Sequence, residues 1–216
     1  MTFATDFSQF NSAQDNMDYD RLLAQRAQRI ARLYEWPRAG ITYPEKRPGD
    51  SVGWDYDSAD RPTGGGILFH SPGSIVFSIV TPSALSNGVT IKSYLNQIST
   101  WITTALSASG YPTHLDSHYP EVVDTSYCAT YYNPFEIRFD GEKVAALALR
   151  KWKSCLLVQG IIHVVSNYPY FNINPMYLSR GLDRDDLTAF QIKTELINHL
   201  NILDEPQLLH TEAPQQ

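Results

Sequence analysis

The feature that most constrains this chain is a triple-glycine loop placed directly before a short apolar run. Residues 61–70 read RPTGGGILFH, and residues 71–73 read SPG, which is typical of a turn. Glycines carry no Cβ atom and accept positive φ, so their backbone N–H groups can approach a ligand closely, as in anion-binding nests. The pattern predicts a glycine loop that leads into a buried strand, with Arg61 before it and His70 at its end. Three glycines taken alone more often mark a flexible hairpin tip.

Length, charge and cysteine content narrow the class of protein. The chain has 216 residues, which suits one domain, and its 43% hydrophobic and 12% aromatic content argues against disorder. The formal net charge of −6 argues against non-specific nucleic-acid binding, which depends on Lys and Arg. No apolar run approaches the roughly 20 residues that span a bilayer, and no secretory signal is visible. Two cysteines make no disulfide framework, so we expect free thiols in a reducing cytoplasm.

Apolar periodicity predicts a mixture of helices and strands. We expect helices over residues 15–34, 90–107 and 185–203, and strands near 39–43, 67–70, 74–80, 135–139, 144–149 and 156–165. Residues 44–60 have the composition of a surface loop, 112–133 that of an irregular segment and 167–181 that of a loop. Without a βαβ rhythm, the pattern predicts an α+β domain with a mixed, largely antiparallel sheet. We expect a frayed segment over 1–12, a single domain over 13–205 and a loose tail over 206–216.

A second informative stretch is the segment 140–150, which reads DGEKVAALALR. Asp140-Gly141 is a hairpin signal, and Lys143 enters the strand that follows among small residues. Small residues leave room for a ligand beside the strand, and lysine supplies a compact cation with three donors. A lone turn lysine is usually solvated. With the glycine loop in the same chain, Lys143 becomes a candidate for contact with a ligand.

These stretches together resemble lipoate–protein ligase A and the octanoyltransferases, which share the biotin/lipoate protein ligase catalytic domain. Residues 61–70 are similar to that family's loop, Arg-Arg-x-Ser/Thr-Gly-Gly-Gly-x-x-x-His, and residues 140–150 to its Gly-x-Lys-Ile-x-Gly-Ser-Ala-x-x-Arg segment. Residues 16–23, NMDYDRLL, resemble the family's opening helix. The resemblance runs from about residue 13 to 203. It implies a class II synthetase-like domain, with a mixed, largely antiparallel sheet flanked by helices.

The resemblance also implies a site. In that family the lysine contacts the acyl carboxyl or carbonyl, so Lys143 is the expected catalytic residue. Acyl transfer builds negative charge on an oxygen, which a fixed cation and backbone N–H groups stabilise in a dry site. The glycine loop and its strand enclose the fatty chain and, in ligases, the nucleotide. The residues expected to bind the acyl substrate are Arg61, Gly64, Gly65, Gly66, Ile67, Leu68, His70, Ala146 and Ala148.

The chain departs from the family's pattern at four places. Asp60 replaces the first arginine of the pair, and Ser71 replaces the Asp after the loop histidine. Leu147 stands where the family has Ser, so it either adds bulk or faces the other side of the strand. Gln159 replaces the His of the family's His-Gly. Each change weakens the handling of an adenylate more than it weakens the fold.

The two cysteines are candidate nucleophiles. Cys128 precedes Lys143 by 15 residues, the interval that the resemblance to one octanoyltransferase branch implies, and the Glu136-Ile137 that follows matches that branch. Cys155 follows Lys143 by 12 residues, where the other transferase branch carries its nucleophile. A nearby cation would favour the thiolate of either. Both cysteines are equally compatible with a role as small buried hydrophobes.

Metal sites receive little support. His114 and His118 have ligand-like spacing only if helical, and no third ligand follows nearby. The carboxylates of residues 55–60 are typical of a solvated loop rather than a cation site. We therefore expect no metal site built by the protein alone.

The resemblance implies attachment of lipoate or octanoate to a lysine of a lipoyl-domain acceptor, of the H-protein or E2-subunit type. A ligase would use ATP and Mg²⁺ through an acyl-adenylate. A transferase would use an acyl carrier protein and a cysteine thioester, without a cofactor. The chain is shorter than the two-domain ligases, which favours a transferase, a ligase with an accessory subunit or a degenerate member. The alternative function is a non-catalytic module that binds the acyl group or the lipoyl domain.

Overall fold

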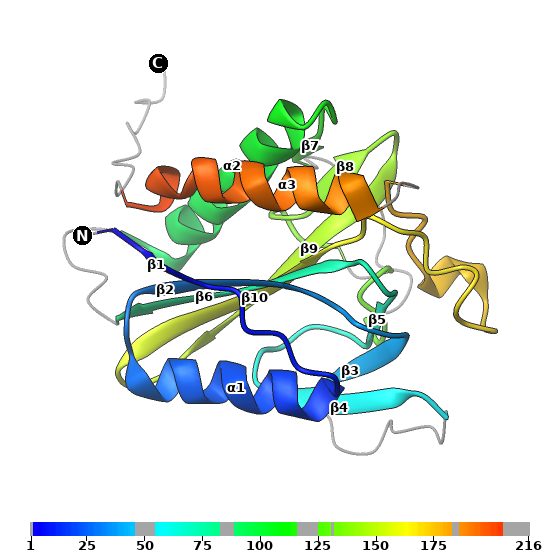
Figure 1. The fold of residues 1–216 in the computed structure, drawn as a ribbon, viewed down its shortest axis with the longest axis horizontal. Helices are drawn as coiled ribbons and strands as arrows, with labels where there is room; N and C mark the ends of the chain where they lie inside the picture. The colour runs from blue at the N-terminus through cyan, green and yellow to red at the C-terminus, as the bar shows by residue number, and fades with distance from the viewer. Residues whose placement is uncertain are drawn as a thin grey trace, which may run out of the picture.

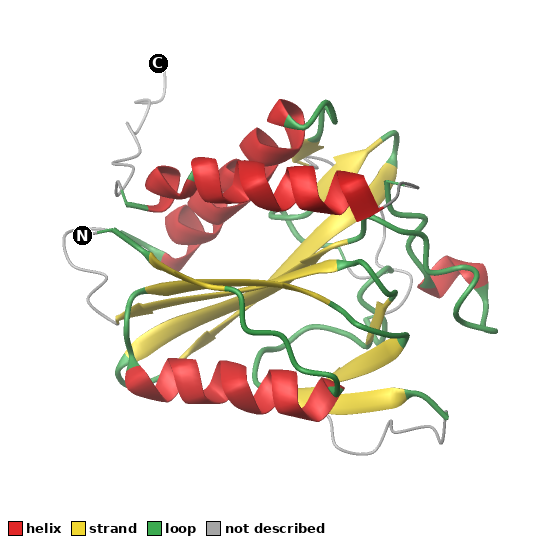
Figure 2. Ribbon diagram, viewed as in Figure 1, coloured by secondary structure: helices red, strands yellow, loops and turns green. Residues whose placement is uncertain are grey.

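The computed structural model describes residues 2–45, 55–82, 89–115, 125–130, 132–182 and 186–204. Within these ranges the elements alternate irregularly between strand and helix, as Figures 1 and 2 show. In chain order they are β1 (Ala4–Asp6), α1 (Ala13–Arg26), β2 (Ile30–Glu35), β3 (Gly40–Pro44), β4 (Asp57–Arg61), β5 (Leu68–His70), β6 (Ile75–Pro82), α2 (Ile91–Ala108), β7 (His114–Leu115), β8 (Ile137–Phe139), β9 (Glu142–Lys151), β10 (Cys155–Ile162), the 3₁₀ turn η1 (Pro175–Tyr177), α3 (Asp186–Asn198) and η2 (Leu200–Leu203).

The described strands form two sheets. The larger has the order β1-β2-β6-β10-β9-β8-β7, in which β1 pairs with β2 in parallel and every other neighbouring pair is antiparallel. The smaller has the order β4-β3-β5, with β4 parallel and β5 antiparallel to β3. The prediction of an α+β domain with a mixed, largely antiparallel sheet is therefore confirmed.

The two faces of the large sheet carry different layers. Helices α2 and α3 lie across one face, while α1 and the small sheet lie against the other (Figure 1). Phe77, Trp101 and Val158 belong to the apolar cluster on the α2/α3 side, and all are fully buried. Because side chains alternate along a strand, the same strands present Val76, Ala146 and other residues to the opposite layer. Residues of this second layer line the cavities described below.

The first helix is shorter than predicted. Helix α1 begins after Ser12, whose side chain accepts the backbone N–H of Asp15, and it ends where Ala27 adopts a left-handed conformation at φ 49°. Residues 30–35 form strand β2 instead. Ile30 and Tyr34 are four residues apart, which suits one helix face, but they also suit a strand whose residues 31–34 are all buried between two layers. The predicted helix over 15–34 is wrong after Arg26.

Three short strands lie where no strand is predicted. Residues 4–6, within the segment expected to fray, pair with β2, residues 57–61 pair with β3, and residues 114–115, within the segment expected to be irregular, pair with β8. In β4 the alternate residues Ala59 and Arg61 are buried, so it is an edge strand with one face covered. The remaining loop residues 46–54, the tail after 204 and His118 lie outside the described residues.

The other elements lie close to the predicted positions. The helix expected over 90–107 is α2, capped by a Thr90–Ser93 capping box. The expected third helix divides into α3 and η2. None of the described helices has the length and apolar character needed to cross a membrane.

Candidate active site

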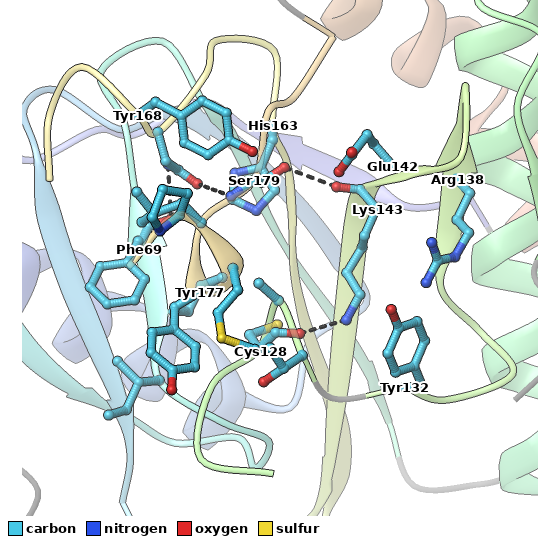
Figure 3. Close-up of a pocket in the computed structure, with 18 residues that line it drawn as sticks. Phe69, Cys128, Tyr132, Arg138, Glu142, Lys143, His163, Tyr168, Tyr177 and Ser179 are labelled. Carbon is cyan, nitrogen blue, oxygen red and sulfur yellow. Dashed lines mark hydrogen bonds between the residues drawn. The ribbon is translucent and has the colours of Figure 1, made fainter. Parts of the chain in front are cut away.

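Two adjoining cavities lie between the large sheet and the glycine loop. The larger measures about 380 Å³ and the smaller about 270 Å³. Leu68 and Cys128 line both cavities, so the two meet at these residues. The glycine loop, His70, Ala146 and other apolar residues line the smaller cavity. Figure 3 shows the larger cavity, where Lys143 extends toward the backbone of Cys128, and Tyr168, Tyr177 and His163 are among the lining residues.

The glycine loop packs tightly against the segment that carries Cys128. The N–H of Ile67 donates to the Ser126 carbonyl at 2.6 Å, and the N–H of Cys128 donates to the Ile67 carbonyl at 2.8 Å. A Cβ on Gly66 would lie 2.6–2.8 Å from backbone atoms of residues 126–128. Gly65 has φ +95°, which side chains rarely adopt, whereas a Cβ on Gly64 would meet nothing. Gly65 therefore permits the backbone turn, and Gly66 permits the close contact with the backbone of residues 126–128.

Arg61 lies beneath the glycine loop. Its guanidinium donates to the carbonyls of Thr42 at 2.9 Å, Gly64 at 2.7 Å and Gly66 at 2.6 Å. Burial lowers the pKa of Arg61 to about 10, while the charge on a Cys128 thiolate acts in the opposite direction. The guanidinium is thus committed to holding the loop and also lies within electrostatic reach of Cys128.

His70 ends the apolar strand β5 and packs inside the fold. Its ring stacks on Trp36 with centroids 3.9 Å apart, and Nε2 lies 2.9 Å from the Thr42 hydroxyl. Burial lowers the pKa of His70 well below its usual value, so the ring is neutral at pH 7. This histidine lines the smaller cavity as an uncharged wall.

Lys143 reaches the cavities because of a β-bulge. Arg138 pairs with Lys143 and Ile137 pairs with Ala145, so Val144 is an extra residue on β9. The bulge shifts the alternation of side chains, and Lys143 points to the cavity side. Its ammonium donates to the Cys128 carbonyl and to Glu136 Oε1, the latter at 2.6 Å.

Glu136, which sequence reasoning does not assign to the site, is almost completely buried at 1% exposure. Desolvation raises its pKa to about 7, although Lys143 acts in the opposite direction. Asn133 fixes the turn before it, since the Asn133 side chain accepts the N–H of Phe135 and its carbonyl accepts the N–H of Glu136. The match of Glu136-Ile137 to one transferase branch is the sequence signal that could have pointed to it.

The small residues of β9 form the floor of the smaller cavity. Ala146 and Ala148 line it from the same face of the strand as Lys143. Leu147 belongs to the apolar cluster under α2 and α3 and also borders the smaller cavity. Opposite Leu147, a Cβ on Gly160 would lie 2.1 Å from the Phe77 ring, so the packing of Phe77 requires a glycine there.

The structure separates the two cysteines. Cys128 is partly exposed and lies where the cavities meet. Cys155 is fully buried between α1 and the large sheet, its thiol donates to the Ala24 carbonyl, and it lines neither of these cavities. Burial raises the pKa of the Cys155 thiol. Of the two candidate nucleophiles, Cys128 alone lies beside Lys143.

The sequence matches the family described as the lipoyl protein ligase A/B catalytic domain over residues 10–177. The chain belongs to this family. Among curated protein sequences, none matches it.

Solved structures of lipoate protein ligases share the fold. A candidate lipoate protein ligase from T. acidophilum is 15% identical, with a TM-score of 0.74 over 93% of this chain and 85% of the other. A structure of the same protein with bound lipoic acid is 15% identical, with a TM-score of 0.70 over 94% and 86%. Lipoate-protein ligase A bound with ATP is 17% identical, with a TM-score of 0.66 over 94% and 85%. These likenesses establish the fold.

The departures from the family's motifs have structural partners in this chain. Gln159 accepts a hydrogen bond from the Thr63 hydroxyl at 2.8 Å and donates one to Asp20 at 2.7 Å, so it links the glycine loop to α1. Asp20 also forms a fully buried ion pair with Arg32 at 2.6 Å. Ser71 accepts a hydrogen bond from the Asn167 amide at 2.6 Å. In this member of the family, neutral side chains fill these two positions and hold the loop.

His163 is a second residue that sequence reasoning missed. It follows β10, lines the larger cavity and is 4% exposed. Burial, together with the nearby Lys143, lowers the pKa of His163 to about 3, so the ring is neutral. Among the described residues, no group of three or more His, Cys, Asp or Glu side chains lies close enough together to hold a metal ion.

Proposed function

We propose that this protein transfers a lipoyl or octanoyl group to a lysine of a lipoyl-domain acceptor, through a thioester on Cys128. The observation that carries the proposal is the position of Cys128, which lines both cavities while its own carbonyl accepts a hydrogen bond from Lys143. One cavity can hold the acyl chain while the other admits the donor and then the acceptor.

The smaller cavity suits an acyl chain. Its walls combine the glycine loop, the uncharged His70 and the alanines of β9, with an apolar lining from residues such as Val76 and Met17. At about 270 Å³ it lies just below the range of roughly 300–1,000 Å³ for small-molecule sites. A short, flexible fatty chain matches this size and polarity.

The chemistry proceeds in two balanced steps. The Cys128 thiol gives up its proton to the departing thiolate of the donor while its sulfur forms a thioester with the acyl carbon. The amine of the acceptor lysine then attacks that carbon, an amide forms, and the amine's proton goes to the leaving Cys128 sulfur. Each attack places negative charge on the carbonyl oxygen, and the Lys143 ammonium beside Cys128 stabilises it.

The ATP-dependent ligase is the second candidate, because a family member with the same fold was solved with ATP bound. Fewer cationic side chains are available here to bind the phosphates of a nucleotide. Asp60 stands where the family's loop has its first arginine, and Arg61 is engaged by the backbone carbonyls of the loop. These features support an acyl-protein donor over an adenylate.

An acyl-acceptor assay tests the function. Apo lipoyl domain is incubated with the protein and either octanoyl-acyl carrier protein without ATP, or lipoate with ATP and Mg²⁺, and intact mass is measured. We expect acylation with the carrier protein alone. Lys143→Ala should lower the rate about 10²–10³-fold, the loss typical of a removed oxyanion donor.

Three outcomes would count against this assignment. Acylation only with ATP would favour the ligase. No acylation under either condition would favour the non-catalytic binding module. Acylation by a folded Lys143→Ala variant at the wild-type rate would remove Lys143 from the site.

A further inference from the structure

A buried ion pair lies where the two cavities meet. Glu136 lines the smaller cavity and is 1% exposed, while Lys143 lines the larger one and is 7% exposed. Glu136 Oε1 and Lys143 Nζ are 2.6 Å apart. Glu136 Oε2 is buried and has no hydrogen-bond partner among the described residues. Both charges have therefore lost most of their contact with water.

Stability alone does not account for such a pair. Removing two charges from water costs several kcal/mol per ion, and replacing a buried pair with apolar side chains is often neutral or stabilising. Two local features nevertheless bring the two side chains together here. The bulge at Val144 turns Lys143 toward the cavities, and the hydrogen bonds of Asn133 fix the turn that precedes Glu136.

The pair has a clear electrostatic consequence. A lysine buried without a counter-charge loses its proton more easily, and a neutral amine stabilises an oxyanion poorly. The Glu136 carboxylate contacts Lys143 and supplies a negative charge beside it. The other titratable side chains that line the same two cavities are Arg61, His70, Cys128, Tyr132, Arg138, Glu142, His163, Tyr168 and Tyr177.

We propose that Glu136 is a positioning residue for acyl transfer, which keeps Lys143 charged and, through Lys143, fixes the backbone of Cys128 between the cavities. The inference rests on the proposed function, because Lys143 is the group expected at the reacting carbonyl. Glu136 acts on the acyl group only through Lys143.

The kinetic test is Glu136→Gln, which keeps the shape and removes the charge. We expect kcat for acyl transfer to fall about 10-fold or more while KM for the donor stays within about 3-fold, because the lost interaction acts in the transition state. The alkaline limb of the pH–rate profile should move to lower pH as Lys143 loses the charge of Glu136. The matched control is Glu35→Gln, which breaks the Glu35–Lys193 pair between β2 and α3, away from both cavities. It should change neither quantity.

A second measurement does not depend on the activity. In protein labelled with ¹³C at lysine, the Lys143 ¹³Cε resonance, assigned with Lys143→Arg, should change with pH differently in Glu136→Gln and in wild type, because the neighbouring carboxylate is gone. It should shift little in Glu35→Gln. If wild type transfers no acyl group, the proposed function fails, and this titration still tests the pair.

The inference also has a test in wild type alone, should Glu136→Gln fail to fold. The Lys143 ¹³Cε resonance should then show a step at the pH where Glu136 ionises, which the Glu136 side-chain carboxyl resonance reports independently. A wild-type titration in which Lys143 does not respond to the ionisation of Glu136 would overturn the inference. So would a folded Glu136→Gln variant with wild-type kcat or an unshifted Lys143 titration.

Discussion

At the scale of single residues, the three consecutive glycines are not equivalent. Gly66 lies against the backbone of residues 126–128, Gly65 adopts a positive φ, and Gly64 faces open space. The sequence shows three identical residues and cannot rank them. The ranking depends on the segment around Cys128, which is distant in the chain and pairs with Ile67.

Gly66→Ala and Gly64→Ala form a matched pair that tests this ranking. The Cβ of Ala at 66 would force backbone apart, so we expect a loss of about 1–3 kcal/mol in the free energy of unfolding. At 64 the same substitution should lie within about 0.5 kcal/mol of wild type or be slightly stabilising, since it restricts the unfolded chain. Urea denaturation measures both. Equal stability of the two variants would contradict the close contact at Gly66.

The sequence predicted those site residues whose role follows from a short motif alone. The motif predicts Lys143 and the glycine loop at one site, and the structure brings them together around Cys128. The motif does not show that the Arg61 guanidinium donates hydrogen bonds to the carbonyls of the glycine loop. It also could not choose between Cys128 and Cys155, because burial of Cys155 against α1 depends on packing between distant segments.

At the scale of elements, the β-bulge between β8 and β9 decides where Lys143 points. Strict alternation from Lys143 would place it on the same face as Leu147, under α2 and α3. The extra residue Val144 reverses this. A bulge leaves little trace in a single sequence, so the side of the sheet on which Lys143 lies could not be derived from the strand pattern.

His163, which follows β10 and lines the larger cavity, predicts how the stability of the fold depends on pH. Its pKa in the folded protein, about 3, lies below that of the unfolded chain, near 6.5. The unfolded state therefore binds the proton first, and stability present above pH 6.5 is lost as pH falls toward 3. Relative to wild type, His163→Gln should lose less stability on acidification, by up to about 1.4 kcal/mol per pH unit.

The slope, rather than the absolute stability, is the informative quantity, because any cost of burying glutamine at this position is the same at every pH. Glu136 contributes with the opposite sign, since its raised pKa makes stability fall as pH rises from about 4.5 to 7. Comparing variant with wild type at each pH removes that contribution. Parallel stability curves for wild type and His163→Gln would contradict the neutral, buried ring.

At the scale of the whole molecule, the fold class was predictable and several boundaries were not. Hydrophobic periodicity located α2 and the central strands, because long amphipathic or buried segments carry a strong signal. It extended α1 into β2, where Ile30 and Tyr34 suit either element. It missed β1, β4 and β7, which are short strands defined by their neighbours β2, β3 and β8.

The architecture places the two cavities beside the large sheet. The large sheet carries α2 and α3 on one face and α1 with the small sheet on the other (Figure 1), and its strands β9 and β10 line the smaller cavity. The other walls of the two cavities come from the glycine loop and from the segments around Cys128 and residues 163–179. The central claim is that Cys128, between the cavities, carries the acyl group.

Trapping the acyl-enzyme tests this claim most directly. The protein is incubated with octanoyl-acyl carrier protein, without ATP or acceptor, and its intact mass and peptide masses are measured before and after hydroxylamine. We predict one octanoyl group on Cys128 that hydroxylamine removes, its absence in Cys128→Ala, and its presence in Cys155→Ala. The account would be contradicted by an adduct on Cys155, by no adduct in the folded wild type, or by wild-type acylation of the acceptor by Cys128→Ala.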